Sequence, residues 1–178
     1  VVAPVGGGGL LGGVWRGFLD LKRLGLVDRI PRMAGVQAAG CAPLKQALDG
    51  GFSFQESLRH PWPDPKTMAG GIADDILFDG HTVLPALRTT GGAAVTVEEH
   101  EIEAAALALA RQEGVLCEPT AAVAVAALNK LPGAGPDTRV CCLVTGNGLK
   151  DIAFFQERTP GPVPVRPALE DVRKALED

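Results

Sequence analysis

Several features that would assign a protein to a special class are missing from this sequence. No apolar run approaches the length of a membrane span, and no signal-peptide pattern opens the chain. A net charge of −4 supplies no basic footprint for nucleic acid. The four cysteines show no metal-ligand spacing, and the adjacent Cys141 and Cys142 lie in an apolar run, where we expect small buried thiols. We therefore expect a cytoplasmic protein with no metal site, no nucleic-acid partner and no membrane partner.

What the sequence has instead is a glycine-rich loop near its beginning. Four consecutive glycines at 6–9 follow the apolar run 1–5 and precede an apolar segment of helical period that begins at Leu10. In the order strand, glycine turn, helix, backbone N–H groups can approach a ligand closely, and the helix dipole adds its positive end. We interpret the loop as a seat for a phosphate group. The alternative is a tight strand-to-helix turn, for which one or two glycines suffice.

Strand and helix patterns alternate along the chain, which predicts an α/β fold. We expect an open three-layer fold, with a mostly parallel twisted sheet and helices on both faces. The expected strands are residues 1–5, 32–38, 93–97 and 139–144, and the expected helices are 10–24, 42–49, a helix ending near 112, 119–131 and 168–177. A capping box of Thr96 and Glu99 is expected to start the helix that ends near 112. Residues 1–160 would form one domain, and 161–178 a linker with a peripheral helix.

Two loops are expected to meet in this fold. Residues 139–144 predict a central parallel strand, which delivers the loop 145–148 at its carboxyl end, and the glycine loop 6–9 follows the first strand in the same way. Ligands of open α/β sheets bind at the carboxyl ends of the strands. We therefore expect both loops to contribute to one site.

The loop also satisfies the dinucleotide pattern G-x-G-x-x-G through Gly7, Gly9 and Gly12. That fingerprint requires an acidic residue near the end of the next strand, and none lies close to Gln37. A P-loop would require Lys-Ser/Thr after its last glycine, and Val14 stands there instead. The terminal phosphate of a small cofactor remains.

Five short motifs together resemble a known family. They are residues 4–13 (PVGGGGLLGG), 35–38 (GVQA), 67–73 (TMAGGIA), 118–122 (EPTAA) and 144–151 (VTGNGLKD). In this order they resemble the threonine synthase branch of the tryptophan synthase β-like enzymes, which are fold-type II enzymes dependent on pyridoxal phosphate. The last motif distinguishes threonine synthases from the dehydratases and cysteine synthases, which usually have serine at its threonine.

The resemblance implies a pyridoxal 5′-phosphate site with defined roles. The glycine loop would bind the phosphate, Thr145 would place its hydroxyl against the pyridine nitrogen, and Glu118 would lie near the ring. From the residues alone, Thr145 could equally be a turn residue and Glu118 a carboxylate stabilised by a helix dipole. The complete expected set of cofactor-binding residues is Gly6, Gly7, Gly8, Gly9, Leu10, Gly71, Ile72, Glu118, Thr145 and Gly146.

The resemblance also implies what this sequence does not contain. In the family, a Schiff-base lysine binds the cofactor aldehyde and lies ahead of the glycine loop. The sequence starts after that position and without an initiator methionine, so we expect a C-terminal fragment with no catalytic residue and no activity of its own. Asp74 and Asp75 depart from the Gly/Pro-containing continuation typical of the family.

The expected function is that of part of a threonine synthase-like lyase, which converts O-phosphohomoserine and water to threonine and phosphate. The family suggests a homodimer with a small amino-acid substrate. Alternatives within the family are a threonine/serine dehydratase or another β-replacing enzyme. Two further alternatives are a non-catalytic phosphate- or nucleotide-binding module, and a split enzyme whose lysine comes from a separate N-terminal chain.

Overall fold

The computed structural model describes residues 1–177 and contains an open parallel sheet covered on both faces. Within these residues the sheet has three strands, β1 (Val2–Pro4), β2 (Ala34–Ala38) and β3 (Ala93–Val97), in the order β1-β2-β3. Both strand pairs are parallel. The expected α/β architecture is therefore confirmed.

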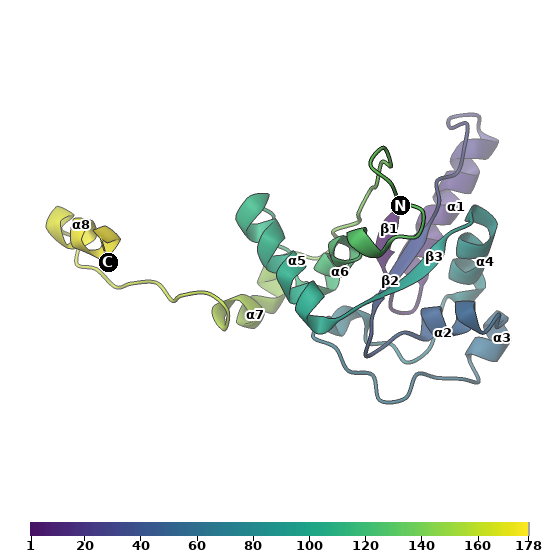
Figure 1. The fold of residues 1–178 in the computed structure, drawn as a ribbon, viewed down its shortest axis with the longest axis horizontal. Helices are drawn as coiled ribbons and strands as arrows, with labels where there is room; N and C mark the ends of the chain where they lie inside the picture. The colour runs from purple at the N-terminus through teal and green to yellow at the C-terminus, as the bar shows by residue number, and fades with distance from the viewer. Residues whose placement is uncertain (178) are drawn as a thin grey trace.

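The helices lie in two layers (Figure 1). On one face are α1 (Gly9–Arg23), α2 (Pro43–Asp49) and α4 (Gly80–Thr90), and on the other are α5 (Glu99–Gln112) and α6 (Pro119–Ala126). Each face has its own apolar cluster: Leu11, Leu44 and Leu84 belong to one, Val36 and Ile102 to the other. The remaining elements are α3 (Phe54–Ser57), η1 (Gly70–Ile72), η2 (Leu128–Lys130), η3 (Gly148–Asp151), α7 (Ile152–Gln156) and α8 (Leu169–Glu177).

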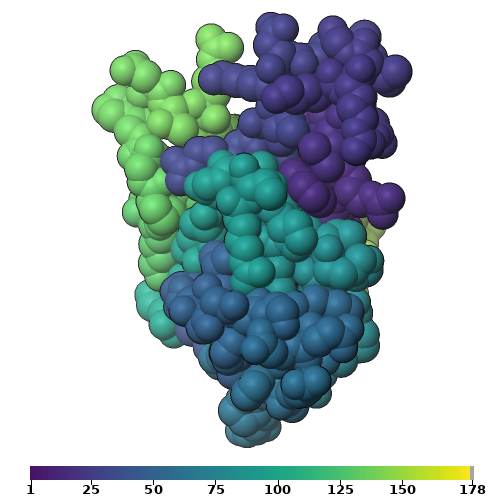
Figure 2. All heavy atoms as spheres, turned by 90° about the vertical axis from the view of Figure 1, so that its right-hand side faces the viewer, coloured from purple at the N-terminus to yellow at the C-terminus, as the bar shows by residue number. Residues whose placement is uncertain are grey.

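Helix α4 supports the amino-terminal half of α1. A Cβ atom on the buried Gly12 would lie 2.2 Å from the hydroxyl oxygen of Thr82, so the two backbones approach closely there. In Figure 2 the teal segment that contains α4 lies between the purple N-terminal segment and the blue segment around residues 50–70. The glycine loop, which leads into α1, is consequently held by a packed layer.

The expected central strand at 139–144 is wrong. Leu143 and the carbonyl of Cys141 hydrogen-bond with Val2 on the outer edge of β1, at 2.9 and 2.8 Å, but the segment is otherwise irregular. Because β1 is short and no further described strand lies next to residues 139–144, this segment stays at the open edge of the sheet and is not buried. Cys141 is exposed and Cys142 half-buried, so the expectation of two buried thiols also fails.

The expected start of helix α5 is also wrong. The capping box of α5 consists of Glu98 and Glu101, not of Thr96 and Glu99, since the strand runs through Val97. Residues 54–57 form the capped turn α3, and residues 84–88 belong to the longer α4. The expected tail helix is confirmed as α8, at the end of an extended segment (Figure 1). No helix within residues 1–177 has the length and apolar character needed to cross a membrane.

Candidate functional site

A cavity of about 230 Å³ opens at the carboxyl end of β1. Four segments far apart in the sequence form its walls: the glycine loop, η1, the start of α6 and the loop at 145. The lining residues are Pro4, Val5, Gly6, Gly7, Gly8, Gly9, Leu10, Gly71, Ile72, Thr120 and Thr145. The expected meeting of the two loops at one site is confirmed, and eight of the ten expected residues, Gly6, Gly7, Gly8, Gly9, Leu10, Gly71, Ile72 and Thr145, line this cavity.

The glycine loop presents backbone N–H groups without protein acceptors. Within residues 1–177, no hydrogen bond is donated by the N–H groups of residues 6–10. The first turn of α1 contains no acidic residue. Unpaired N–H groups at the positive end of a helix dipole bind anions, and phosphate in particular. The loop therefore provides the donors that a terminal phosphate needs.

The glycines are required by packing behind the loop. A Cβ atom on any of the four would fall 2.6–2.9 Å from a side-chain atom of residues 74–83, which lead into α4 and form its first turn. In loop order, these atoms belong to Asp74, Phe78, Val83 and Asp79. At Gly8 the φ angle of +103° also disfavours any residue with a Cβ. The backbone can thus lie flat on residues 74–83, and the N–H of Asp79 donates to the carbonyl of Gly7 at 2.7 Å.

Thr120 is a lining residue that the sequence interpretation missed. Its hydroxyl oxygen accepts a hydrogen bond of 3.1 Å from the N–H of Gly71, and a Cβ on Gly71 would lie 3.0 Å from that oxygen. Thr120 therefore joins the start of α6 to η1, the opposite wall. A signal for it was present in the sequence, because Thr120 belongs to the motif 118–122.

Glu118 and Gly146 do not line the cavity; they contact each other beside it. The N–H of Glu118 donates to the carbonyl of Gly146 at 3.0 Å, and the carboxylate accepts from the Lys150 ammonium at 2.9 Å. A Cβ on Gly146 would lie 1.8 Å from Oε1 of Glu118, so the carboxylate occupies the space beside this glycine. Glu118 immediately precedes α6, so its carboxylate lies at the positive end of the helix dipole. This is the position that the alternative interpretation, a carboxylate stabilised by a helix dipole, requires.

The titratable groups near the cavity provide no nucleophile among the described residues. Burial raises the pKa of the Cys117 thiol. Burial, with Asp74 nearby, raises the pKa of Cys41 to about 11. None of the six lysines of the sequence lines the cavity.

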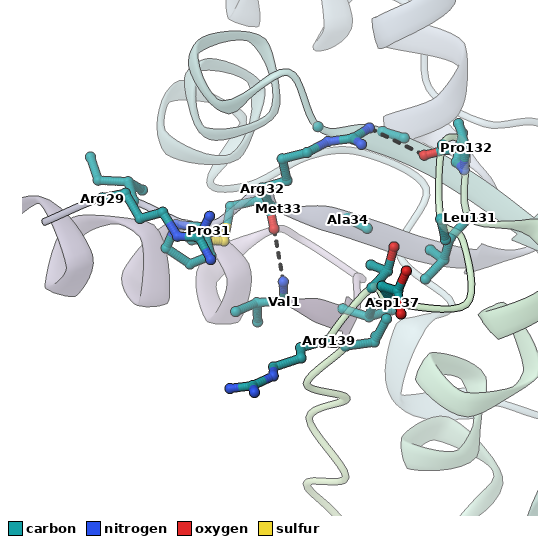
Figure 3. A pocket seen from close by; sticks show the side chains of 18 residues that line it. Val1, Arg29, Pro31, Arg32, Met33, Ala34, Leu131, Pro132, Asp137 and Arg139 are labelled. Carbon is teal, nitrogen blue, oxygen red and sulfur yellow. Dashed lines mark hydrogen bonds between the residues drawn. The ribbon is translucent and has the colours of Figure 1, made fainter. Parts of the chain in front are cut away.

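A larger cavity of about 550 Å³ lies at the opposite end of the sheet, where the strands begin. Figure 3 shows Arg32 directed toward Pro132, while Arg139 extends away from it. The Arg32 guanidinium donates to the carbonyls of Gly91 and Pro132, at 3.0 and 3.3 Å. The guanidinium of Arg32 is therefore used to join two loops, and the lining arginines Arg32 and Arg139 do not point toward one common anion site.

Comparison with known families assigns the chain. The family model described as "Pyridoxal-phosphate dependent enzyme" matches residues 1–146. The chain belongs to this family. The match spans the sheet and every segment that lines the 230 Å³ cavity.

Relatives within the pyridoxal-phosphate dependent enzyme family share the whole length of the chain. A threonine synthase of Methanocaldococcus jannaschii is 32% identical over 181 residues, which cover 100% of this chain and 44% of the relative. A threonine synthase of Methanosarcina acetivorans is 35% identical over 99% of this chain and 43% of the relative. The chain thus spans less than half the length of these curated relatives.

Solved structures of other proteins share the fold of this chain. An L-serine ammonia-lyase of Rhizomucor miehei superposes with a TM-score of 0.67 at 21% identity, over 88% of this chain and 48% of that one. A "T.th." threonine deaminase gives a TM-score of 0.56 at 27% identity, over 78% of this chain and 50% of that one. The likeness to the ammonia-lyase concerns the fold alone.

Proposed function

We propose that the cavity at the glycine loop binds pyridoxal 5′-phosphate. The single observation on which the proposal depends is the set of unpaired N–H groups of residues 6–10, which face a cavity that Thr145 also lines. These N–H groups would bind the phosphate, and Thr145 would contact the ring nitrogen. The cavity is smaller than the roughly 300–1,000 Å³ of drug-sized ligand pockets, as suits a small cofactor.

The side chains present favour a particular chemistry. When bound, the cofactor supplies an electron sink for carbanions next to an amino group. Thr145 offers a neutral hydroxyl, which hydrogen-bonds to the ring nitrogen without holding a proton on it as a carboxylate would. Gly71 leaves the ring face open to close approach of backbone, and Thr120 holds that backbone in place. Such a site favours elimination and replacement at the β and γ carbons over transamination.

The activity we propose is that of a threonine synthase: O-phosphohomoserine and water give threonine and phosphate. The threonine synthases that match over the full chain support it, as does Thr145 within its Thr-Gly-Asn-Gly sequence. A second candidate is threonine deamination, which is supported by the 27% identity to the solved threonine deaminase. Phosphate release from O-phosphohomoserine distinguishes the first activity from formation of 2-oxobutyrate from threonine.

Either reaction needs a lysine from outside residues 1–178. We propose that it comes from a further part of a longer polypeptide or from a separate chain, because no lysine of this sequence lines the cavity. We further propose a homodimer in the cytoplasm as the working form.

Calorimetric titration of the 178-residue chain tests the cofactor proposal. The ligands are pyridoxine 5′-phosphate, which lacks a reactive aldehyde, inorganic phosphate and adenosine monophosphate. We expect pyridoxine phosphate to bind most tightly, and Thr145→Val to reduce that preference while the exposed control Thr89→Val does not. Tighter binding of the nucleotide, or no preference for pyridoxine phosphate over phosphate, would overturn the proposal.

A further inference from the structure

The loop that presents Thr145 has few attachments to the body of the protein. On its amino side, Leu143 hydrogen-bonds to Val2, and on its carboxyl side a short antiparallel pairing joins it to the segment before α6. That pairing consists of two hydrogen bonds of 3.0 Å, from Glu118 N–H to Gly146 O and from Gly148 N–H to Leu116 O. The position of the Thr145 hydroxyl depends on this attachment.

The Glu118 carboxylate lies against the loop immediately after Thr145. Its Oε1 takes the space that a Cβ on Gly146 would occupy, 1.8 Å from that position. The Glu118 side chain is 14% exposed and its partner Lys150 is 65% exposed, with 2.9 Å between Nζ and Oε1. Lys150 lies in η3, and its ammonium binds Oε1, the same oxygen that lies against Gly146. One carboxylate oxygen therefore contacts both the backbone of Gly146 and the ammonium group of Lys150.

A largely buried carboxylate without a cation is unfavourable, because it has lost much of its hydration. If the ammonium were removed, Glu118 would gain by turning toward water, and its contact with Gly146 would be lost. The backbone of the loop would then be free to shift.

We propose that Lys150 is a positioning residue for the cofactor ring. By pairing with Glu118 it keeps that carboxylate on Gly146, and so holds the Thr145 hydroxyl at the ring end of the cavity. The inference rests on the proposed function. It assigns Lys150 no contact with the phosphate, because that group belongs to the glycine loop at the other end.

The test compares Lys150→Met and Lys150→Arg in the 178-residue chain, with Lys66→Met as the matched control from another exposed ion pair. The probes are pyridoxine 5′-phosphate and inorganic phosphate. We expect Lys150→Met to weaken binding of pyridoxine phosphate about three- to fivefold, the range of a partly exposed ion pair, and to leave phosphate binding unchanged. Lys150→Arg should restore the affinity, and in a Thr145→Val background Lys150→Met should add nothing.

Two results would overturn the inference: equal losses for both probes, which would indicate a general structural role, or unchanged preference for pyridoxine phosphate in Lys150→Met. A wild-type chain that shows no preference for pyridoxine phosphate would instead refute the proposed function. Urea unfolding of each variant, followed by its two tryptophans, identifies any that is unfolded, and Lys150→Arg then carries the comparison.

Discussion

Gly8→Ala tests whether packing behind the glycine loop, rather than flexibility, requires glycine there. The new methyl group would lie 2.8 Å from Cγ1 of Val83, which is fully buried and cannot move outward. The backbone at Gly8 also has a φ of +103°. We expect about 1–2 kcal/mol from the backbone conformation and about 1–3 kcal/mol from overpacking, so roughly 2–5 kcal/mol in all.

The matched control is Gly13→Ala, further along the chain and inside α1. A Cβ there meets nothing within 4 Å, so alanine should raise the free energy of unfolding by about 0.5–1 kcal/mol through helix propensity. A third comparison places Gly8→Ala in a Val83→Ala background. The contact with Cγ1 is then absent and only the Cβ of residue 83 remains, at 3.2 Å, so the penalty should fall toward the backbone contribution of about 1–2 kcal/mol.

Urea unfolding measured by circular dichroism gives the three differences. The reasoning is refuted if Gly8→Ala and Gly13→Ala change stability in the same direction. It is also refuted if Gly8→Ala lowers the free energy of unfolding as much in the Val83→Ala background as in the wild type. The contact with Cγ1 of Val83 would then not contribute to the loss.

Three further outcomes are expected. Thr120→Val should cost about 1 kcal/mol of stability by removing the hydrogen bond to η1, and Thr120→Ser should not; equal losses in urea unfolding would count against that bond. The buried Cys41 should resist alkylation at pH 8, because its pKa is raised to about 11 and its thiolate forms only near and above that pH, whereas the exposed Cys141 should react. Mass spectrometry of the alkylated chain measures which of the two cysteines carries the label. Lys130 lowers the pKa of Glu101 through a hydrogen bond, so their pairing stabilises the fold above the usual pKa of a glutamate and is lost as the pH falls through the lowered value. The variant Lys130→Met should therefore be less stable than the wild type at pH 7 and equally stable in acid. A loss of stability that does not change with pH would exclude this linkage.

Signals that act over a few residues allowed much of this fold to be predicted. The run 93–97 was expected as a strand and is β3 with those bounds, because a short apolar run with β-branched residues lies between a glycine pair and a helix there. The glycine loop was expected to lead from a strand into a helix, and β1 and α1 confirm it. The two loops from distant parts of the sequence do line one cavity, although residues 139–144 form no strand, because this segment still runs parallel to β1 through the bridge between Val2 and Cys142.

The failures have physical causes beyond the reach of local pattern. Residues 139–144 read as a buried strand, but burial depends on a neighbouring element that no described residue supplies. The cap of α5 shifted by two residues because β3 pairs with β2 through Val97, which leaves Glu98 to begin the helix. The hydrogen bond between Thr120 and Gly71 could not be predicted from local pattern, since the two residues lie 49 positions apart.

The tetraglycine loop has a consequence for anyone who would redesign this protein for another ligand. The bare faces of its glycines look toward residues 74–83 and not toward the cavity, so mutations there would spoil the scaffold before they altered selectivity. Selectivity can be varied at wall positions that already bear side chains, such as Val5, Ile72, Thr120 and Thr145. A saturation library confined to those four sites could be screened for binding of new ligands, and it would leave the anion-binding N–H groups of the glycine loop unchanged.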